Sequence, residues 1–374
     1  NIFSQTFLRF RSTSLDLDMG KIVVKENRFI GDVSAVKDSS GANTLEIYGT
    51  CKALIEGNSF SQTNTYRHLK ISSYVGATDV VSVKGYPEYV SIANNVFEGS
   101  VNFKQVIDCY AGMDHVNIYD NYFDVLGALC IFESKIAGAG GETVVKSLQQ
   151  LKIDSNVIVV RDAPSDLFRM NSYYGTSLYA GDSNSAYFTG NVVENKTSNS
   201  VRTLDVRGFK NVTIADNTVI GGGGTGNFTQ VQLIAVENVI ITNNNLSDGS
   251  IAITKATTTS NPSISYDADL KTALLSGNVI HNIRNFGGIY LRYHQQIDSL
   301  IITDNRLKGN KTLETYMLAG IYIRECASIK STVCVNNLME IDLQNAHRLI
   351  FVTSSVDKLQ EHSNSWNPSI GYSS

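Results

Sequence analysis

A motif of the form apolar-x-x-Asn-x-apolar recurs along the chain and limits its possible folds more than any other feature. It reads, for example, as "SIANNVF", "NIYDNYF" and "TIADNTV". Successive anchor asparagines lie 26 to 37 residues apart. The spacing never falls below 26 residues but often exceeds this value by a variable amount. Such spacing indicates a solenoid whose repeats are interrupted by loops of different length. The anchors are Asn27, Asn58, Asn95, Asn121, Asn156, Asn191, Asn217, Asn244, Asn278, Asn305 and Asn337, and "EHSNSW" adds Asn364 as a degraded copy.

Each repeat is made of short strands. Runs of 4 to 6 residues alternate with a period of two, as in "VRTLDVRG" and "GGIYLRY". About 26 residues with two or three strands is the length of one rung, meaning one turn, of a parallel β-helix. The consensus of leucine-rich repeats is absent, and WD40 blades need more residues and their own signature. We therefore predict an all-β, right-handed, single-stranded parallel β-helix of about 12 rungs.

The anchor asparagines are predicted to be structural and not ligand-binding. An inward amide at the turn between two strands can bond its own backbone and the asparagine of the next rung. An isolated buried amide would be costly, whereas an amide in a satisfied ladder is not.

Charge and cysteine usage exclude several classes of protein. The net charge of -4, with scattered Lys and Arg, argues against a nucleic-acid partner. No apolar run of about 18 residues is present, so no membrane insertion is predicted. The five cysteines include Cys130 and Cys334 in strand-like runs, which predicts buried free thiols in a reducing compartment. A disulfide framework is the less favoured reading. No metal-ligand spacing occurs, and no cofactor is predicted.

The repeat, with few prolines and reduced cysteines, resembles the central body of bacteriophage tailspikes, the pectate-lyase-like β-helices that depolymerise capsule or O-antigen. The resemblance rests on no catalytic motif. It implies a homotrimer that binds bacterial capsule or lipopolysaccharide glycan. It also implies a virion-tail protein that folds in the host cytoplasm and acts at the bacterial surface. The abrupt start "NIFSQTFLRFRST" fits a missing N-terminal part that attaches to the phage tail or baseplate.

The predicted organisation has three parts. Residues 1–20 are expected to form a lead-in strand or cap, residues 21–366 the β-helix, and residues 367–374 a tail. Long insertions at 134–147 and 172–185 fall on consecutive rungs and would build one wall of a cleft. We therefore expect the site between the repeats of Asn95 and Asn217.

Strand-borne carboxylates in this span are the predicted catalytic residues, because glycoside hydrolysis needs a pair of carboxyl groups. In "TLDVRG" the alternation predicts that Leu204 and Val206 point inward, and that Asp205 and Arg207 point outward. The same reasoning points Phe168 and Met170 inward. The catalytic candidates are Asp205, Glu133, Asp108 and Asp166.

Nearby cationic and aromatic residues are the predicted substrate-binding groups. Arg169 and Arg207 could bind an acidic sugar by bidentate contacts, and Tyr173 and Tyr174 could stack on sugar rings. Each has an alternative: the Asp and Arg side chains could form a solvated salt-bridge ladder, and the tyrosines could pack in the loop or at a trimer contact. The "GGGG" run at 221–224 is read as a turn.

A second cluster competes for the role of the active site. "IYLRYHQQ" and "IYIRECAS" align without gaps, which stacks Tyr290 on Tyr322 and Arg292 on Arg324, with His294 nearby. In a polysaccharide lyase, Arg neutralises a uronate and Tyr or His accepts the C5 proton. The alternative is a Tyr/Arg ladder at the trimer interface. Three functions thus remain open: a hydrolase with an Asp/Glu pair, a lyase, and a non-catalytic receptor-binding spike.

Overall fold

The computed structural model shows an all-β protein. Every regular element in the described residues is a β-strand, and no helix occurs among them. The described strands fall into two compact units, one before and one after the junction of Tyr187 and Phe188. The structure describes residues 1–12, 17–32, 43–63, 65–72, 86–110, 113–133, 135–138, 141–144, 148–163, 166–171, 184–197, 201–222, 229–255, 269–283, 287–309, 319–340, 348–352 and 357–366.

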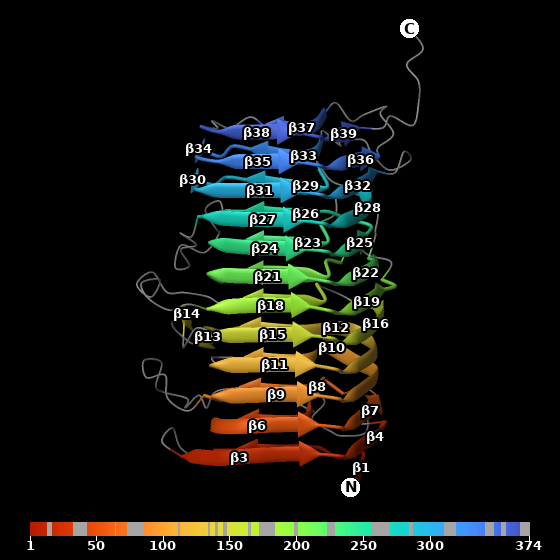
Figure 1. The fold of residues 1–374 in the computed structure, drawn as a ribbon. Coiled ribbons are helices and arrows are strands. Elements are labelled where there is room, and N and C mark those ends of the chain that lie inside the picture. The colour runs from red at the N-terminus through yellow and green to blue at the C-terminus, as the bar shows by residue number, and fades with distance from the viewer. Residues whose placement is uncertain are drawn as a thin grey trace. The chain divides into compact units, whose positions relative to one another are not determined.

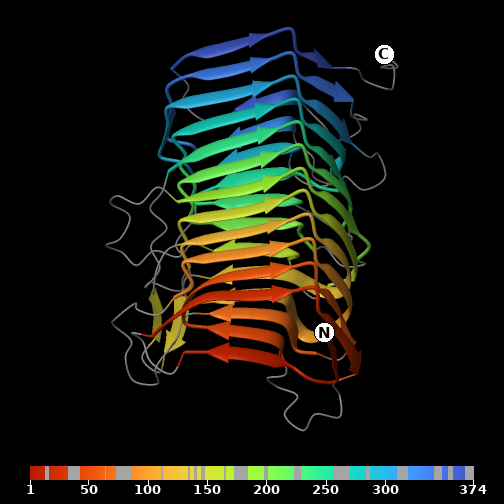
Figure 2. The ribbon, with the colours of Figure 1, turned by 60° about the horizontal axis from the view of Figure 1, so that its bottom comes forward.

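Three parallel ladders build the first unit, and in Figures 1 and 2 the strands of each ladder lie one beside the next. The leading ladder, whose strands end just before the anchors, contains β3 (Asp18–Lys25), β6 (Thr50–Glu56), β9 (Tyr89–Ala93), β11 (His115–Tyr119) and β15 (Gln150–Asp154). The trailing ladder, which begins just after the anchors, contains β1 (Ile2–Ser4), β4 (Arg28–Asp32), β7 (Ser59–Thr63), β10 (Val96–Tyr110), β12 (Tyr122–Glu133) and β16 (Val157–Asp162).

The distal ladder of this unit contains β2 (Leu8–Arg11), β5 (Asn43–Tyr48), β8 (Arg67–Ser72) and β17 (Phe168–Asn171), together with the later parts of β10 and β12. β10 and β12 are long enough to run through both the trailing and the distal ladder. β13 (Lys135–Gly138) and β14 (Gly141–Val144) form an antiparallel pair. β18 (Ser185–Thr189) contains the junction between the units.

The second unit repeats the same three ladders. Its leading ladder contains β21 (Asn211–Ala215), β24 (Asn238–Thr242), β27 (Thr272–Ser276), β31 (Ser299–Thr303), β35 (Thr332–Val335) and β38 (Leu359–His362). Its trailing ladder contains β19 (Val192–Asn195), β22 (Thr218–Gly221), β25 (Asn245–Ser247), β28 (Val279–Ile283), β32 (Arg306–Gly309), β36 (Leu338–Glu340) and β39 (Ser365–Trp366).

Its distal ladder contains β20 (Leu204–Arg207), β23 (Val231–Ile234), β26 (Ile251–Thr254), β29 (Ile289–Arg292), β33 (Ala319–Arg324) and β37 (Arg348–Val352), and β30 (Gln296–Ile297) pairs with β34 (Ser328–Ile329). Long parallel sheets of this kind, in both units, are consistent with the predicted parallel β-helix.

The core of the first unit follows from in-register stacking. Equivalent positions of successive repeats pair strand to strand, so one inward column carries one kind of side chain. The residue two positions after the anchor is Phe29, Phe60, Phe97 and Phe123 in turn, and the ring centroids of neighbours lie 4.8–4.9 Å apart. These rings are buried. Repetition of the sequence thus creates an aromatic stack that holds the rungs together.

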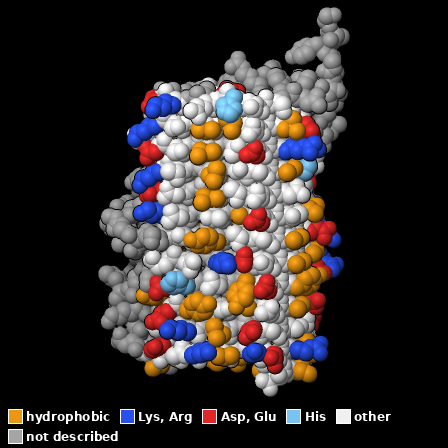
Figure 3. Space-filling view, viewed as in Figure 1, with side chains coloured by type: hydrophobic (Ala, Val, Ile, Leu, Met, Phe, Trp, Pro, Cys, Tyr) orange, Lys and Arg blue, Asp and Glu red, His pale blue; other side chains and the backbone are white. Residues whose placement is uncertain are grey.

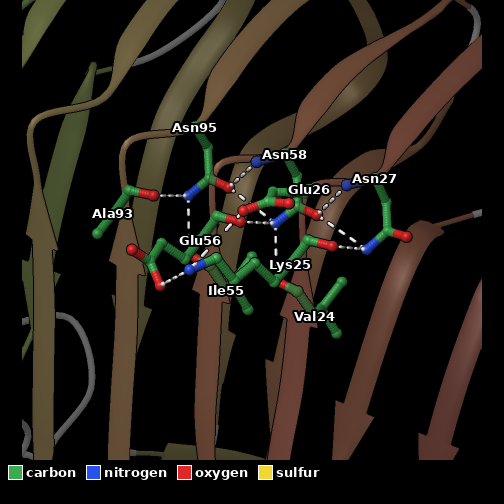
Figure 4. Close-up of polar contacts among 9 residues, drawn as sticks. All are labelled: Val24, Lys25, Glu26, Asn27, Ile55, Glu56, Asn58, Ala93 and Asn95. Carbon is green, nitrogen blue, oxygen red and sulfur yellow. Dashed lines mark hydrogen bonds and ion pairs between the residues drawn. The ribbon is translucent and has the colours of Figure 1, made fainter. Parts of the chain in front are cut away.

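The predicted amide ladder is present in both units, and Figure 4 shows part of it. Asn58 donates from its backbone N and its Nδ2 to Oδ1 of Asn95, at 2.9 and 3.0 Å. The same Nδ2 donates to the carbonyl oxygens of Glu56 and Val24 at 3.1 and 2.8 Å. Since the amide is buried and fully bonded, the structural interpretation of the anchors is confirmed.

The residue before each anchor turns the chain. It has a positive φ of 54° to 67° at all twelve anchors. Glycine, asparagine and aspartate tolerate this left-handed conformation best, and they occupy most of the twelve positions. The position is therefore a second sequence marker of the rung: Glu26, Gly57, Asn94, Asp120, Ser155, Gly190, Asp216, Asn243, Gly277, Asp304, Asn336 and Ser363.

The predicted buried thiol at Cys334 is confirmed. Cys334 is a buried free cysteine of β35, and burial raises the pKa of its thiol to about 12. Cys51 in β6 behaves in the same way, with its pKa also raised to about 12 by burial. Both thiols therefore stay protonated and unreactive at neutral pH. Cys130 lies in β12, and its side chain is outside the described residues.

Candidate functional site

Several predicted site residues lie on the distal ladder of the first unit. Backbone register pairs Asp108 of β10 with Ile131 of β12, and Ile131 with Arg169 of β17. The three residues therefore occupy one column on neighbouring strands. Glu133 follows Ile131 by two residues in β12, and its side chain is outside the described residues.

Asp108 is locked in an ion pair. Its Oδ2 lies 2.6 Å from Nε of Arg67, and both side chains are largely covered, with 7% and 12% of their surface exposed. The Arg67 guanidinium in turn lies 4.5 Å from the ring centre of Tyr66. A carboxylate taken out of water needs such a partner, so Asp108 is held by Arg67 and little of it is open to a ligand.

Arg169 and Asp166 form a looser and more accessible pair. Arg169 Nη2 lies 3.7 Å from Asp166 Oδ2, and 34% of the Arg169 side chain is exposed. Phe168 and Met170, which alternate with Arg169, are buried, as the strand period predicted. Residues 173 and 174, the predicted stacking tyrosines, lie outside the described residues.

Asp205 in the second unit was predicted to point outward, where a substrate could reach it, but it is not exposed. Its side chain is completely covered, because Arg207 and Arg202 lie over it. Arg207 donates from Nε to Oδ1 at 2.9 Å and from Nη2 to Oδ2 at 2.7 Å. The bidentate contact that was predicted for an acidic sugar is thus made to Asp205 itself. Leu204 and Val206 are buried, as predicted.

The predicted register of the Tyr/Arg cluster is confirmed. β29 and β33 pair Tyr290 with Tyr322 and Arg292 with Arg324. The tyrosine rings stack at 5.4 Å with an interplanar angle of 9°. Glu325 lies 2.6 Å from Nε of Arg292 and 2.8 Å from Nε of Arg324, so one carboxylate partly neutralises both cations.

This cluster is more enclosed than a lyase site requires. Tyr290 and Tyr322 are only 7% and 2% exposed. Burial raises the pKa of Tyr290 above its usual value, which disfavours the phenolate that would accept a C5 proton.

The prediction that His294 meets a substrate is corrected by its burial. The imidazole is 1% exposed, with Nε2 3.2 Å from the Ile253 carbonyl oxygen, and Leu270 N donates to Nδ1 at 3.4 Å. Burial lowers the pKa of His294 to about 4. His294 is therefore a neutral core residue that fixes the backbone around it.

A groove that the sequence analysis missed lies on the trailing ladder of the first unit. It is open, has a volume of about 480 Å³, and draws its lining from four neighbouring strands. The lining residues are Thr63 of β7, Glu98 and Gly99 of β10, Asp124 and Leu126 of β12, and Arg161 of β16.

Two carboxylates of this groove occupy paired positions. Glu98 and Asp124 are direct neighbours in the register of β10 and β12. Each stands three residues after its anchor, in "NVFE" and "NYFD". An acid repeated at this position in two consecutive rungs is the sequence signal that could have revealed the groove, because equal positions stack.

A β-bulge brings Arg161 to this pair. Val125 pairs with Val160, but Leu126 pairs with Asp162, so Arg161 is an extra residue in β16. Bulges re-aim side chains. Arg161 reaches Asp124 in a bidentate contact, with Nε 2.6 Å from Oδ1 and Nη2 2.6 Å from Oδ2. The hydrogen bond to Asp124 raises the pKa of Arg161, so the guanidinium stays charged at neutral pH.

Gly99 leaves the groove without a side chain at that point. Its φ is +97°, and a Cβ there would lie 3.2 Å from the carbonyl oxygen of Gln62. The register of β10 against β12 shifts just after it, between Ser100 and Gln105. The glycine therefore allows β10 to leave its regular path at the groove.

Comparisons with protein-family models, with curated proteins and with solved structures gave no match. Among the described residues, no group of three or more His, Cys, Asp or Glu side chains is arranged to hold a metal ion. The described part of the chain also has no helix of the length and apolarity needed to cross a membrane.

Proposed function

We propose that this protein is a glycan depolymerase of the bacteriophage tailspike type. It hydrolyses a bacterial surface polysaccharide, either capsule or O-antigen, with a pair of carboxyl side chains. The groove of the first unit carries the proposal, because two carboxylates from neighbouring strands open onto one accessible hollow of about 480 Å³. No cofactor is needed for this chemistry.

The arrangement around the groove suits an extended polysaccharide. Parallel ladders present the same face rung after rung, so a chain of sugars can follow the surface. Tyr122 and Leu126 flank Asp124 on the outward side of β12 and are 38% and 42% exposed. Such apolar surface beside carboxylates matches a sugar ring, which has apolar faces and polar edges.

The test is a screen of the whole chain against purified capsular and O-antigen polysaccharides, with release of reducing ends as the readout. New reducing ends without absorbance from unsaturated uronate are expected. Unsaturated uronate would favour the lyase, and binding without cleavage would favour a receptor-binding spike. Asp205→Asn serves as a control, because we expect Asp205 to act in folding and not in cleavage.

The proposal includes a homotrimer carried on the virion tail. An uncharged apolar column on the second unit supports a protein contact. Register places Ile240, Leu274, Ile301 and Val333 side by side on four leading strands, and Figure 3 shows hydrophobic side chains gathered over these strands. A row of this kind on an outward face favours contact with another protein surface.

A further inference from the structure

A cationic cluster on the distal ladder of the second unit has no part in the proposed cleavage. Arg292 and Arg324 are direct register partners on β29 and β33, and hydrogen-bonded parallel strands lie about 4.8 Å apart. Their side chains are 25% and 42% exposed, so both guanidinium groups reach the surface. Like charges directly opposite each other destabilise a pair of strands, so this pairing needs a compensating anion.

Glu325 supplies only half of that compensation. Its Oε2 lies 2.6 Å from Nε of Arg292, and its Oε1 lies 2.8 Å from Nε of Arg324. The hydrogen bond with Arg292 lowers the pKa of Glu325, so the carboxylate is ionised at neutral pH. Next to Arg292, Lys255 and Asp269 pair with each other at 3.0 Å and cancel. Two arginines therefore share one carboxylate, and the cluster keeps an excess of one positive charge.

Two tyrosines fix the orientation of the guanidinium groups. Arg324 donates from Nη1 to the Tyr322 hydroxyl at 3.3 Å, and Arg292 forms a hydrogen bond with Tyr290. The two tyrosine rings are buried and stack at 5.4 Å, so the hydroxyls are held in place. Each guanidinium carries five N–H donors in a planar fork, so Glu325 and the hydroxyls leave further donors for a ligand.

The turn after the distal strand carries strained residues at this cluster. Glycine adopts a positive φ without cost, whereas a bulky side chain there is strained. The arginine-bearing rungs nevertheless place Tyr293 and Glu325 at this position, and the Arg292 guanidinium lies 4.0 Å from the Tyr293 ring centre. Strain of this kind is concentrated at ligand-binding sites. In register, φ is 70° at Gly208, 55° at Ala235, 71° at Tyr293 and 55° at Glu325.

We infer that Arg292 and Arg324 form a binding site for the single negative charge of an acidic sugar, such as a uronate carboxylate or a sulfate ester. Such a group accepts bidentate hydrogen bonds from a guanidinium and supplies the one charge that the cluster lacks. The net charge of -4 disfavours a nucleic acid as the source of the anion. The inference goes beyond the proposed cleavage, because this site binds glycan on the second unit and breaks no bond.

Saturation-transfer difference NMR on the whole chain measures this binding. The probes are glucuronate, galacturonate, N-acetylneuraminate and glucose 6-sulfate, with glucose as the neutral reference and acetate as a carboxylate without a sugar. We expect at least one acidic sugar to bind, and glucose and acetate to bind at least about tenfold more weakly. Arg292→Gln and Arg324→Gln should each weaken binding of that acidic sugar by at least about tenfold, since each removes a charge and several donors.

Arg306→Gln is the matched control. Arg306 lies on β32 of the same unit and shares the Glu340 carboxylate with Lys308, at 2.7 and 3.0 Å, so the variant removes the same charge from another pair of cations. It should keep the wild-type affinity. Arg324→Lys keeps the charge and loses the planar fork, so it should fold as the wild type does and still bind several-fold more weakly. The circular dichroism spectrum checks the folding of each variant.

Three results would overturn the site. They are an absence of any acidic sugar that binds more tightly than glucose, acetate binding as tightly as the best acidic sugar, and Arg306→Gln weakening binding as much as Arg292→Gln. Unchanged binding in folded Arg292→Gln and Arg324→Gln would likewise reduce the cluster to a structural ladder. None of these readouts depends on cleavage. A chain that binds an acidic sugar here but releases no reducing ends would support this site and contradict the proposed function.

Discussion

One amide side chain per repeat organises the backbone of two rungs. Asn244 donates from its backbone N and Nδ2 to Asn278 Oδ1, and its Nδ2 also reaches the carbonyl oxygens of Ile214 and Thr242. Its own Oδ1 accepts from Asn217. These partners are backbone or anchor groups with little access to water, so removing the amide leaves several of them unsatisfied.

Asn244→Ala should therefore destabilise the protein by roughly 2–4 kcal/mol, since each buried group that loses its partner costs about 1–3 kcal/mol and part of that cost is relieved by relaxation. Unfolding in urea, followed by circular dichroism, measures the change. Asn245→Ala, at the exposed next position, is the control and should stay within about 0.5 kcal/mol of wild type. Equal stability of the two variants would contradict a structural ladder.

At the scale of the strand, the side chains that pack around a strand decide whether its titratable residues are charged. β8 carries His68, which is completely buried, with the rings of Phe60 and Phe97 at 6.0 and 6.2 Å. Burial lowers the pKa of His68 to about 4, while the Glu98 backbone opposes this shift weakly. The histidine is neutral in the folded protein at every pH above that value.

Stability should fall as the pH drops from about 6.5 toward 4, because the unfolded chain then binds a proton that folded His68 refuses. Between pH 7 and pH 5 the expected loss from this residue is roughly 2 kcal/mol. Urea midpoints at both pH values measure it. His68→Phe should reduce the difference, whereas His115→Gln, on an exposed strand position, should leave it unchanged; an unaltered difference in His68→Phe would contradict the assignment.

For the molecule as a whole, the leading ladder of the second unit offers the surface best suited to association. Ile240, which is 45% exposed, begins a column of apolar side chains. The column continues with Leu274, Ile301 and Val333 on successive strands. Thr242, Ser276 and Thr303 form the adjacent column, so both columns are uncharged. Depletion of charge around an apolar centre is typical of the core of a protein interface.

Ile240→Lys combined with Ile301→Lys should therefore shift the proposed homotrimer to monomers, because buried ammonium groups would lack partners. Light scattering after size-exclusion chromatography measures the mass. Ile220→Lys is the matched control, since Ile220 is 53% exposed but lies on β22, away from this column. A trimer that survives the double substitution would place the interface elsewhere.

The repeat was enough to predict the scaffold. Anchor spacing and period-two alternation gave the all-β class, the inward positions of Phe168 and Met170, and the register of Tyr290 with Tyr322. These features follow from local geometry, because strands alternate and equal positions of a repeat stack. The amide ladder was predictable for the same reason, since one asparagine can satisfy its own turn and the next.

Exposure and site geometry did not follow from that periodicity. Asp205 takes the outward side of its strand but is covered by Arg202 and Arg207, and His294 is enclosed by neighbouring backbone. The groove depends on an extra residue, Arg161, whose bulge aims it at Asp124. Alternation fixes which side of a strand a residue takes. What covers that side depends on long side chains, bulges and neighbouring strands, and these meet only when the chain is folded.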